Sequence, residues 1–324
     1  MKTAFLTCLV SLCVLAANCP TSFSSDTSSA VDPLKARTFH VAVDGNIGYL
    51  AVTAGLKIVD LSEPANPSVL STLVLPQSAS GCTVEEDVVY VAQGPAGVYV
   101  VDVSDKSAPK VIAHIPTTGS AMAVDIEDNV LAVANGTMGV TLIDVSDPKH
   151  PEFVWSSNPT GYVRGLKFYD DRLYVCAGSS GLLVVEVGED AKGTIVAETE
   201  TAGDARDVDF YRQIAFVADG RFGVSVIKLD NDGNASLADT FPTEDLAHGV
   251  AFHKGFVFVA DGLRGVASYE FKRPTGLAHH RRLDTNDGYA DRVTVYDRKL
   301  FVANDYMGIL VFDIYSPRTP KVFQ

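Results

Sequence analysis

Tyr90–Asp105 (YVAQGPAGVYVVDVSD) decides the fold of this chain, because the same pattern returns at 131–148 (LAVANGTMGVTLIDVSDP). In both stretches a short apolar run leads into a glycine-bearing turn. A second, β-branched run follows and closes on an aspartate, Asp102 or Asp144. Short apolar runs bounded by glycine and proline are typical of β-strands. The stretch therefore predicts a β-hairpin that recurs along the chain.

Seven copies of this unit align on the residue that closes the second run, with a spacing of 42 residues that becomes 43 only before the last copy. The closing residues are Asp60, Asp102, Asp144, Glu186, Lys228, Glu270 and Asp313. Each copy also has an earlier run with alternating apolar residues and a weaker run after a proline-rich turn, such as 109–115 (PKVIAHI). Each repeat is therefore predicted to form four short strands.

Repeats of about 40 to 45 residues with four strands are typical of β-propeller blades. One blade exposes apolar residues on both faces, so it is stable only between neighbours, and a closed ring also protects the sheet edges. We therefore predict an all-β fold, a seven-bladed β-propeller that forms a single domain over residues 31–324.

Composition narrows the function classes. The 324 residues are 47% hydrophobic, which is too apolar for a disordered chain. Lysine and arginine number 26 against 40 acidic residues, so the net charge is −14. Nucleic-acid binding depends on a dense basic surface, and we expect no nucleic-acid partner.

The N-terminus predicts export. Lys2 precedes a short apolar run at 4–17 (AFLTCLVSLCVLAA), and a Ser/Thr-rich leader continues to residue 30. This order is typical of a secretory signal peptide, which predicts a secreted or cell-surface protein without a membrane span. Two alternatives remain: the run is retained as an anchor, or Cys19 carries a lipid, although Asn18 is a poor residue before a lipid-modified cysteine.

The turn after the second run resembles a known family. Leu56–Pro67 (LKIVDLSEPANP) is similar to the signature of the LVIVD-repeat family of secreted and surface β-propellers, as are 101–105 (VDVSD) and 143–151 (IDVSDPKHP). The resemblance extends over all seven repeats and is sharpest in repeats one to three and seven. Repeats four to six lose the Ser-Asp-Pro turn. The resemblance implies a propeller fold and an extracellular location, but no single activity.

In a propeller, the blade-connecting loops and the turns between second and third strands emerge on one face, around the channel mouth. The candidate ligand-binding residues predicted for this face are Arg164, Arg206, Arg221, His248, Arg264, Tyr289, Arg292 and Tyr306. Arginine forks bind carboxylate or sulfate groups, and tyrosines, Tyr162 among them, stack on sugar rings. A structural alternative is that Arg206-Asp207 and Asp291-Arg292 lock neighbouring blades together.

These observations favour a binding scaffold for a protein or an anionic glycan on this face. The alternative is an extracellular polysaccharide lyase, in which Arg206 neutralises a uronate while His248 or Tyr289 moves a proton. Whether the chain is an enzyme therefore stays open, with binding favoured. The sequence contains no serine-hydrolase elbow, phosphate loop, dinucleotide fingerprint or zinc spacing, and we expect neither a cofactor nor a metal.

Overall fold

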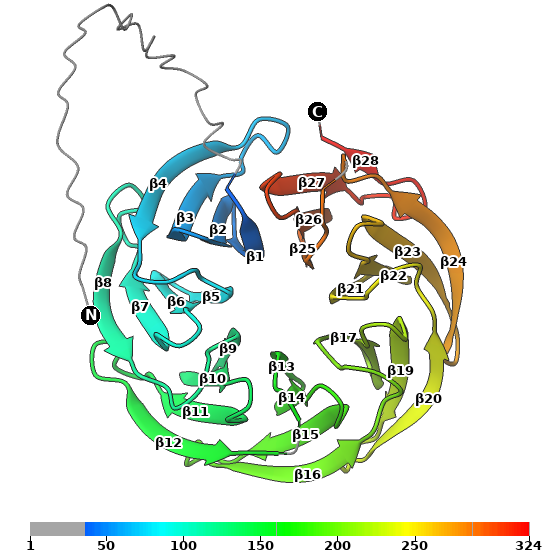
Figure 1. Ribbon diagram of the computed structural model, residues 1–324, viewed down its shortest axis with the longest axis horizontal. Coiled ribbons are helices and arrows are strands. Elements are labelled where there is room, and N and C mark those ends of the chain that lie inside the picture. The colour runs from blue at the N-terminus through cyan, green and yellow to red at the C-terminus, as the bar shows by residue number, and fades with distance from the viewer. Residues whose placement is uncertain (1–35, 160, 287, 324) are drawn as a thin grey trace, which may run out of the picture. The chain divides into compact units, whose positions relative to one another are not determined.

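A computed structural model describes residues 36–159, 161–286 and 288–323. Over these residues the chain folds into seven four-stranded antiparallel sheets that form a ring, and it contains no helix (Figure 1). The predicted seven-bladed β-propeller is thereby confirmed. The described residues therefore include no helix that is long and apolar enough to cross a membrane. The predicted signal peptide and leader at 1–30 lie outside the described residues, so they stay a prediction.

Each repeat supplies one blade. Blades 1 to 3 contain β1 (Thr38–Asp44), β2 (Ile47–Val52), β3 (Gly55–Asp60) and β4 (Ser68–Val74); β5 (Gly81–Glu85), β6 (Val88–Ala92), β7 (Val98–Asp102) and β8 (Lys110–Ile115); and β9 (Ala123–Glu127), β10 (Val130–Ala134), β11 (Val140–Asp144) and β12 (Glu152–Ser157). Blades 4 and 5 contain β13 (Gly165–Tyr169), β14 (Arg172–Cys176), β15 (Leu182–Val187) and β16 (Gly193–Thr199); and β17 (Asp207–Tyr211), β18 (Ile214–Ala218), β19 (Val224–Leu229) and β20 (Ala235–Phe241). Blades 6 and 7 contain β21 (Gly249–His253), β22 (Phe256–Ala260), β23 (Val266–Lys272) and β24 (Gly276–Leu283); and β25 (Arg292–Tyr296), β26 (Lys299–Ala303), β27 (Ile309–Asp313) and β28 (Lys321–Val322).

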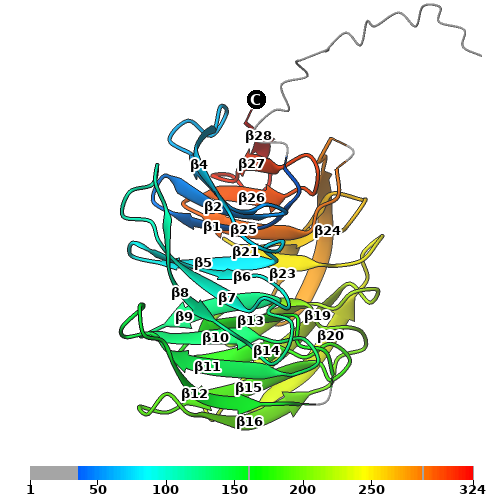
Figure 2. The same ribbon diagram turned by 60° about the vertical axis from the view of Figure 1, so that its left-hand side comes forward.

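The four strands of a blade follow one another from the channel to the rim (Figures 1 and 2). In blades 1 to 6 the outer pair shifts register at the same repeat position, as between Leu142 and Ile143 in blade 3. Such a bulge twists an edge strand and hinders pairing with another chain. It persists in blades 4 to 6, where the Ser-Asp-Pro turn is lost. The bulge is therefore set by the blade rather than by that turn.

The hydrophobic core lies between neighbouring blades, as the apolar faces of a repeat require. One cluster joins Tyr90 and Val100 of blade 2 to Leu131 and Val133 of blade 3, and six similar clusters lie between other blades. The second strands are almost fully buried in all seven blades. Burial on both sides explains why these strands read as continuous apolar runs.

Backbone bridges fix the position of the blade-connecting loops. In blade 5 the turn between β18 and β19 bridges through Gly220 to Ala247, which lies in the loop that leads into blade 6. Gly220 has φ of 59°, a left-handed conformation that favours glycine. The bridge recurs at the junctions from blade 2 to blade 7. At the junction of blades 7 and 1, Thr38 pairs with Asp305, which helps to close the ring.

Candidate binding site at the channel mouth

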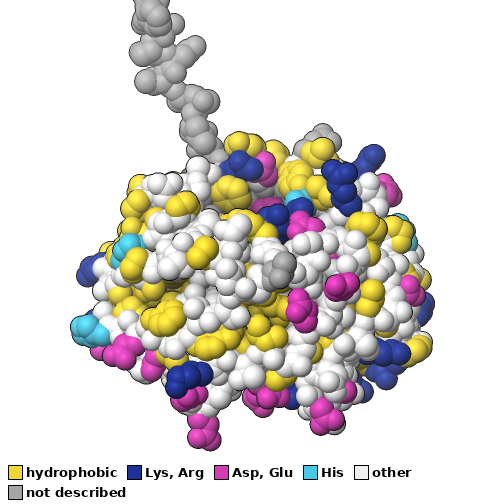
Figure 3. Space-filling model, turned by 60° about the horizontal axis from the view of Figure 1, so that its bottom comes forward, with side chains coloured by type: hydrophobic (Ala, Val, Ile, Leu, Met, Phe, Trp, Pro, Cys, Tyr) yellow, Lys and Arg dark blue, Asp and Glu magenta, His cyan; other side chains and the backbone are white. Residues whose placement is uncertain are grey.

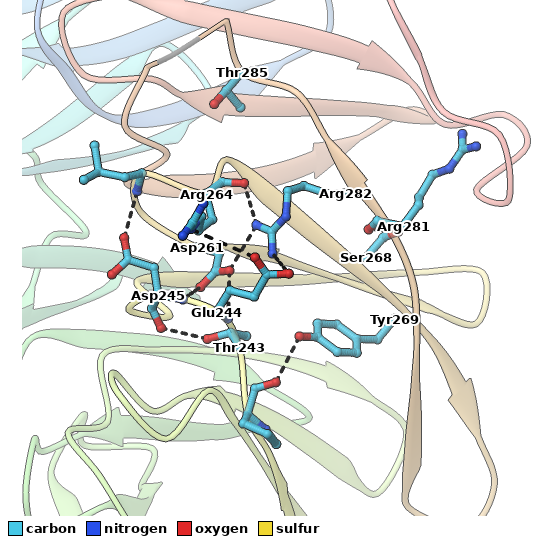
Figure 4. A network of polar contacts seen from close by, with 12 residues as sticks. Thr243, Glu244, Asp245, Asp261, Arg264, Ser268, Tyr269, Arg281, Arg282 and Thr285 are labelled. Atoms are coloured by element: carbon cyan, nitrogen blue, oxygen red, sulfur yellow. Dashed lines mark hydrogen bonds and ion pairs between the residues drawn. The ribbon is translucent and has the colours of Figure 1, made fainter.

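Buried polar side chains in the turns between second and third strands hold the blade-connecting loops in place. Asp261 accepts hydrogen bonds from the backbone N–H groups of Glu244 and Asp245, at 3.2 and 3.0 Å, and also contacts Arg282 (Figure 4). Asp219 does the same in blade 5, where it accepts from Gly203 N at 3.1 Å. At the equivalent position, Gln93 and Asn304 donate to the loop carbonyls of Gln77 and Thr285, at 2.6 and 2.9 Å. Asn135 of blade 3 instead bonds Thr141 of its own blade. Fixed loops give the mouth side chains defined positions.

One residue from each blade forms a ring around the channel mouth, two positions before the residue that begins the apolar alternation of the inner strand. In order the ring is Phe39, Ser80, Met122, Arg164, Arg206, His248 and Asp291. A cavity of about 310 Å³ opens there, and Ser78, Ala79 and Arg292 complete its lining. This volume is at the lower end for small-molecule sites. Figure 3 shows basic, acidic and histidine side chains gathered around a hollow in one face of the ring.

Asp204 holds two of the predicted arginines. Its carboxylate lies 3.3 Å from Nε of Arg164 and 2.9 Å from a terminal nitrogen of Arg206. The guanidinium of Arg164 also lies over the ring of Tyr162, 4.5 Å from its centroid. Within the described residues the two terminal nitrogens of Arg164 have no protein partner. Arg164 is therefore oriented by the protein and keeps two donors for a ligand.

His248 connects Arg206 to Tyr289. Nδ1 of His248 lies 3.0 Å from Nη1 of Arg206, and Nε2 contacts the hydroxyl of Tyr289. An arginine only donates, so Nδ1 accepts and the proton of a neutral imidazole lies on Nε2. Burial, followed by the charge of Arg206, lowers the pKa of His248 to about 4. His248 is therefore neutral at physiological pH, and both of its nitrogens are occupied.

Arg292 forms the floor of the pocket and lines a second cavity of about 430 Å³ inside the channel. Its Nη1 lies 2.5 Å from Asp207 of blade 5, whose other oxygen accepts from Val250 N of blade 6 at 3.0 Å. Arg206-Asp207 and Asp291-Arg292 were expected to lock neighbouring blades together. In the structure Arg292 pairs with Asp207, which joins blades 7 and 5 and contacts blade 6 between them, while Arg206 pairs with Asp204.

We expect Arg292→Met to lower the free energy of unfolding by about 2 kcal/mol, because Asp207 would remain largely buried without its counter-charge. Chemical denaturation with urea measures the loss. Arg298→Met, an exposed position of the same blade, serves as the control and should change stability by no more than about 0.5 kcal/mol. Equal effects of the two substitutions would contradict a structural role for the Arg292–Asp207 pair.

The structure thus brings five of the eight predicted binding residues together: Arg164, Arg206, His248, Tyr289 and Arg292. The other three lie in turns of the same face outside the pocket lining. Arg221 is exposed, Arg264 lies 4.0 Å from Glu244 beside Arg282 (Figure 4), and Tyr306 is 67% exposed beside Arg37. Whether any of the eight binds a ligand stays a prediction.

Asp204 and Met122 were not among the predicted binding residues, and the repeat itself contains the signal for Asp204. Asp204 occupies the repeat position of Tyr162 in the preceding loop and of Tyr289 two loops later, so alignment of the loops places it at the mouth. Met122 carries no chemical signal, yet its sulfur accepts from the hydroxyl of Tyr162 at 3.4 Å. Among the described residues, no group of three or more acidic, histidine or cysteine side chains is placed to hold a metal ion.

Fold and site together define a β-propeller with a polar pocket at its channel mouth. The LVIVD repeat model matches three consecutive repeats, residues 37–73, 76–117 and 118–158, so the predicted resemblance is confirmed over blades 1 to 3. No curated protein matches the chain.

Solved structures resemble the chain in fold alone. The β-propeller domain of Cps50 (Swd1) from Myceliophteria thermophila is 13% identical, with a TM-score of 0.69 over 86% of this chain and 97% of that one. The computationally designed Ika8 protein is 11% identical, with a TM-score of 0.63 over the same shares. BamB from Moraxella catarrhalis is 14% identical, with a TM-score of 0.61 over 85% of this chain and 82% of that one.

Proposed function

We propose that this protein is a secreted or surface-attached binding scaffold that holds an acidic group of a protein or a glycan in the mouth pocket. The observation that carries the proposal is Arg164. Asp204 and the ring of Tyr162 fix its guanidinium, while its terminal nitrogens keep their hydrogen-bonding capacity. A preoriented guanidinium edge matches carboxylate or sulfate oxygens, and its ordering cost is already met in the free protein.

The hydrogen bonds around His248 favour binding over proton transfer. A general base needs a free lone pair near the substrate proton, but Nδ1 of His248 accepts from Arg206 and Nε2 carries the proton. Burial raises the pKa of Tyr289, so its hydroxyl stays protonated at neutral pH. The arrangement supports a role for both residues in holding Arg206 in position.

A polysaccharide lyase is the second candidate, because His248, Tyr289 and Arg206 do lie in mutual contact at one pocket. Catalysis would require a substrate to displace Arg206 from Nδ1 of His248 and so free a base. The two candidates differ in product: a lyase leaves an unsaturated sugar that absorbs ultraviolet light, and a binder leaves its ligand intact.

The test uses the full-length protein with a panel of uronate-containing polysaccharides, sulfated polysaccharides and acidic peptides. We expect no ultraviolet-absorbing product and a raised melting temperature with at least one acidic ligand. Arg164→Gln should weaken that ligand about tenfold, while Arg221→Gln, on the same face but outside the pocket, should leave its affinity unchanged. Formation of an ultraviolet-absorbing product would show that the protein is a lyase and would contradict the binding scaffold. No shift with any acidic ligand would refute an anion site.

A further inference from the structure

The two halves of the mouth pocket differ in chemistry. Blades 4 to 7 line it with charged and polar side chains: Arg164, Arg206, His248, Asp291 and Arg292. Blades 1 to 3 contribute the apolar Phe39, Ala79 and Met122 together with two serines, Ser78 and Ser80. Because the blades follow one another around the ring, these two sets lie on opposite sides of the opening (Figure 1). A ligand that fills the pocket therefore meets cations on one side and a largely apolar wall on the other.

The charges around the pocket nearly cancel. Arg164 and Arg206 share the carboxylate of Asp204, and Arg292 pairs with Asp207. Asp291 adds a third carboxylate beside His248, which is neutral. Three arginines thus face three aspartates. A polyanion such as a sulfated polysaccharide would need a surplus of positive charge along its length, and the pocket offers no such surplus.

One ligand group matches the donors that remain. The terminal nitrogens of Arg164 form a fork that fits the two oxygens of a single carboxylate. A body rich in hydroxyl groups would lose hydration against Phe39, Ala79 and Met122 without finding enough partners there. An aliphatic or aromatic body would instead gain by leaving water.

We infer that the mouth pocket takes a single carboxylate carried on an apolar body about the size of an amino-acid side chain. This inference rests on the proposed function and narrows its ligand. Two sources offer that chemistry: the C-terminal residue of a peptide, whose α-carboxylate stands beside an apolar side chain, and a free small carboxylic acid. In both cases the carboxylate contacts Arg164 and the apolar body lies against the wall formed by Phe39, Ala79 and Met122.

Isothermal titration of the full-length protein with 4-methylpentanoate as the probe tests the inference. Three comparison compounds each remove one feature: acetate lacks the apolar body, 4-methylpentanamide lacks the charge, and glucuronate has a polar body. We expect 4-methylpentanoate to bind at least tenfold more tightly than each of them. Peptides that end in leucine, with a free or an amidated carboxyl group, distinguish the sources. Tighter binding of the free-carboxyl peptide than of 4-methylpentanoate assigns a peptide C-terminus, and the reverse order assigns a small acid.

Two variants locate the contacts. Arg164→Gln should weaken the binding of 4-methylpentanoate at least tenfold and leave the binding of 4-methylpentanamide unchanged. Met122→Gln, which keeps the side-chain length and an acceptor for Tyr162, should reduce the preference for 4-methylpentanoate over acetate. Glucuronate or a sulfated polysaccharide binding as tightly as 4-methylpentanoate would overturn this inference and leave the proposed scaffold intact. If no anionic compound binds, polysaccharides and acidic peptides included, both this inference and the proposed binding function are wrong.

Discussion

Replacing Asp219 with alanine lowers the free energy of unfolding by about 3 kcal/mol, since three donors lose a buried acceptor. One carboxylate oxygen accepts from the hydroxyl of Thr201 at 2.7 Å, and the other accepts from Ser225 Oγ at 2.8 Å and Gly203 N at 3.1 Å. The side chain is fully buried, so water cannot replace the lost acceptor without entering the blade. Urea denaturation followed by tryptophan fluorescence or circular dichroism measures the loss.

Two substitutions control this experiment. Asp219→Asn should cost less than the alanine, because one side-chain oxygen remains at this position as an acceptor for Ser225 or Gly203. Asp232→Ala, in an exposed turn of the same blade, should change stability by no more than about 0.5 kcal/mol. Asp219→Ala should also weaken the binding of ligands in the mouth pocket. Asp219 holds the backbone of Gly203, and the next residue, Asp204, orients Arg164 and Arg206. A loss below about 1 kcal/mol would argue against the role assigned to this residue.

His40 makes the protein less stable in acid. It lies on the inner strand of blade 1, and burial, followed by the charges of Arg292 and Lys167, lowers its pKa to about 3. In the unfolded chain the pKa returns to about 6.5. Between these two values the unfolded state binds a proton that the folded state does not. Stability therefore falls by about 1.4 kcal/mol per pH unit as the pH drops from about 6.5 toward 3.

Comparison with His40→Gln isolates this contribution. Buried carboxyl groups act in the opposite direction: burial raises the pKa of Asp125 and Asp219, so their protonation favours the folded state as the pH falls. These groups are present in both proteins, and their effect cancels in the difference. Urea midpoints measured from pH 7 to pH 4 should decline more steeply for the wild type than for the variant. Parallel curves would show that His40 is accessible to protons in the folded state.

The fold could be predicted because its information is local and repeated. The hairpin at 90–105 specifies two strands within sixteen residues, and its recurrence every 42 residues gives the number of blades. The face of the site follows from the same pattern, since every repeat begins its inner strand at the mouth. Five of the eight predicted binding residues meet there for that reason. Repetition thus predicts position well.

Chemical partners could not be predicted, because they depend on side-chain reach between repeats. Arg292 stands next to Asp291 in the sequence but pairs with Asp207, 85 positions earlier. Asp204 looks like an ordinary loop residue, yet it holds both Arg164 and Arg206. Arg221, Arg264 and Tyr306 have suitable chemistry on the correct face and still lie outside the pocket, since the turns carry them away from the channel. These outcomes depend on distances in space, which residue spacing does not give.

The ring of one residue per blade separates the stability of the fold from its preference for a ligand. The buried second strands and the loop-fixing polar residues hold the propeller together, and none of them is one of the seven ring positions. Each of the seven mouth residues comes from a different repeat and can change without altering the backbone of its neighbours. With seven such positions, a small number of substitutions can give many pocket chemistries on one scaffold. The preference for a particular ligand can therefore be altered one blade at a time, while the cost in stability stays small.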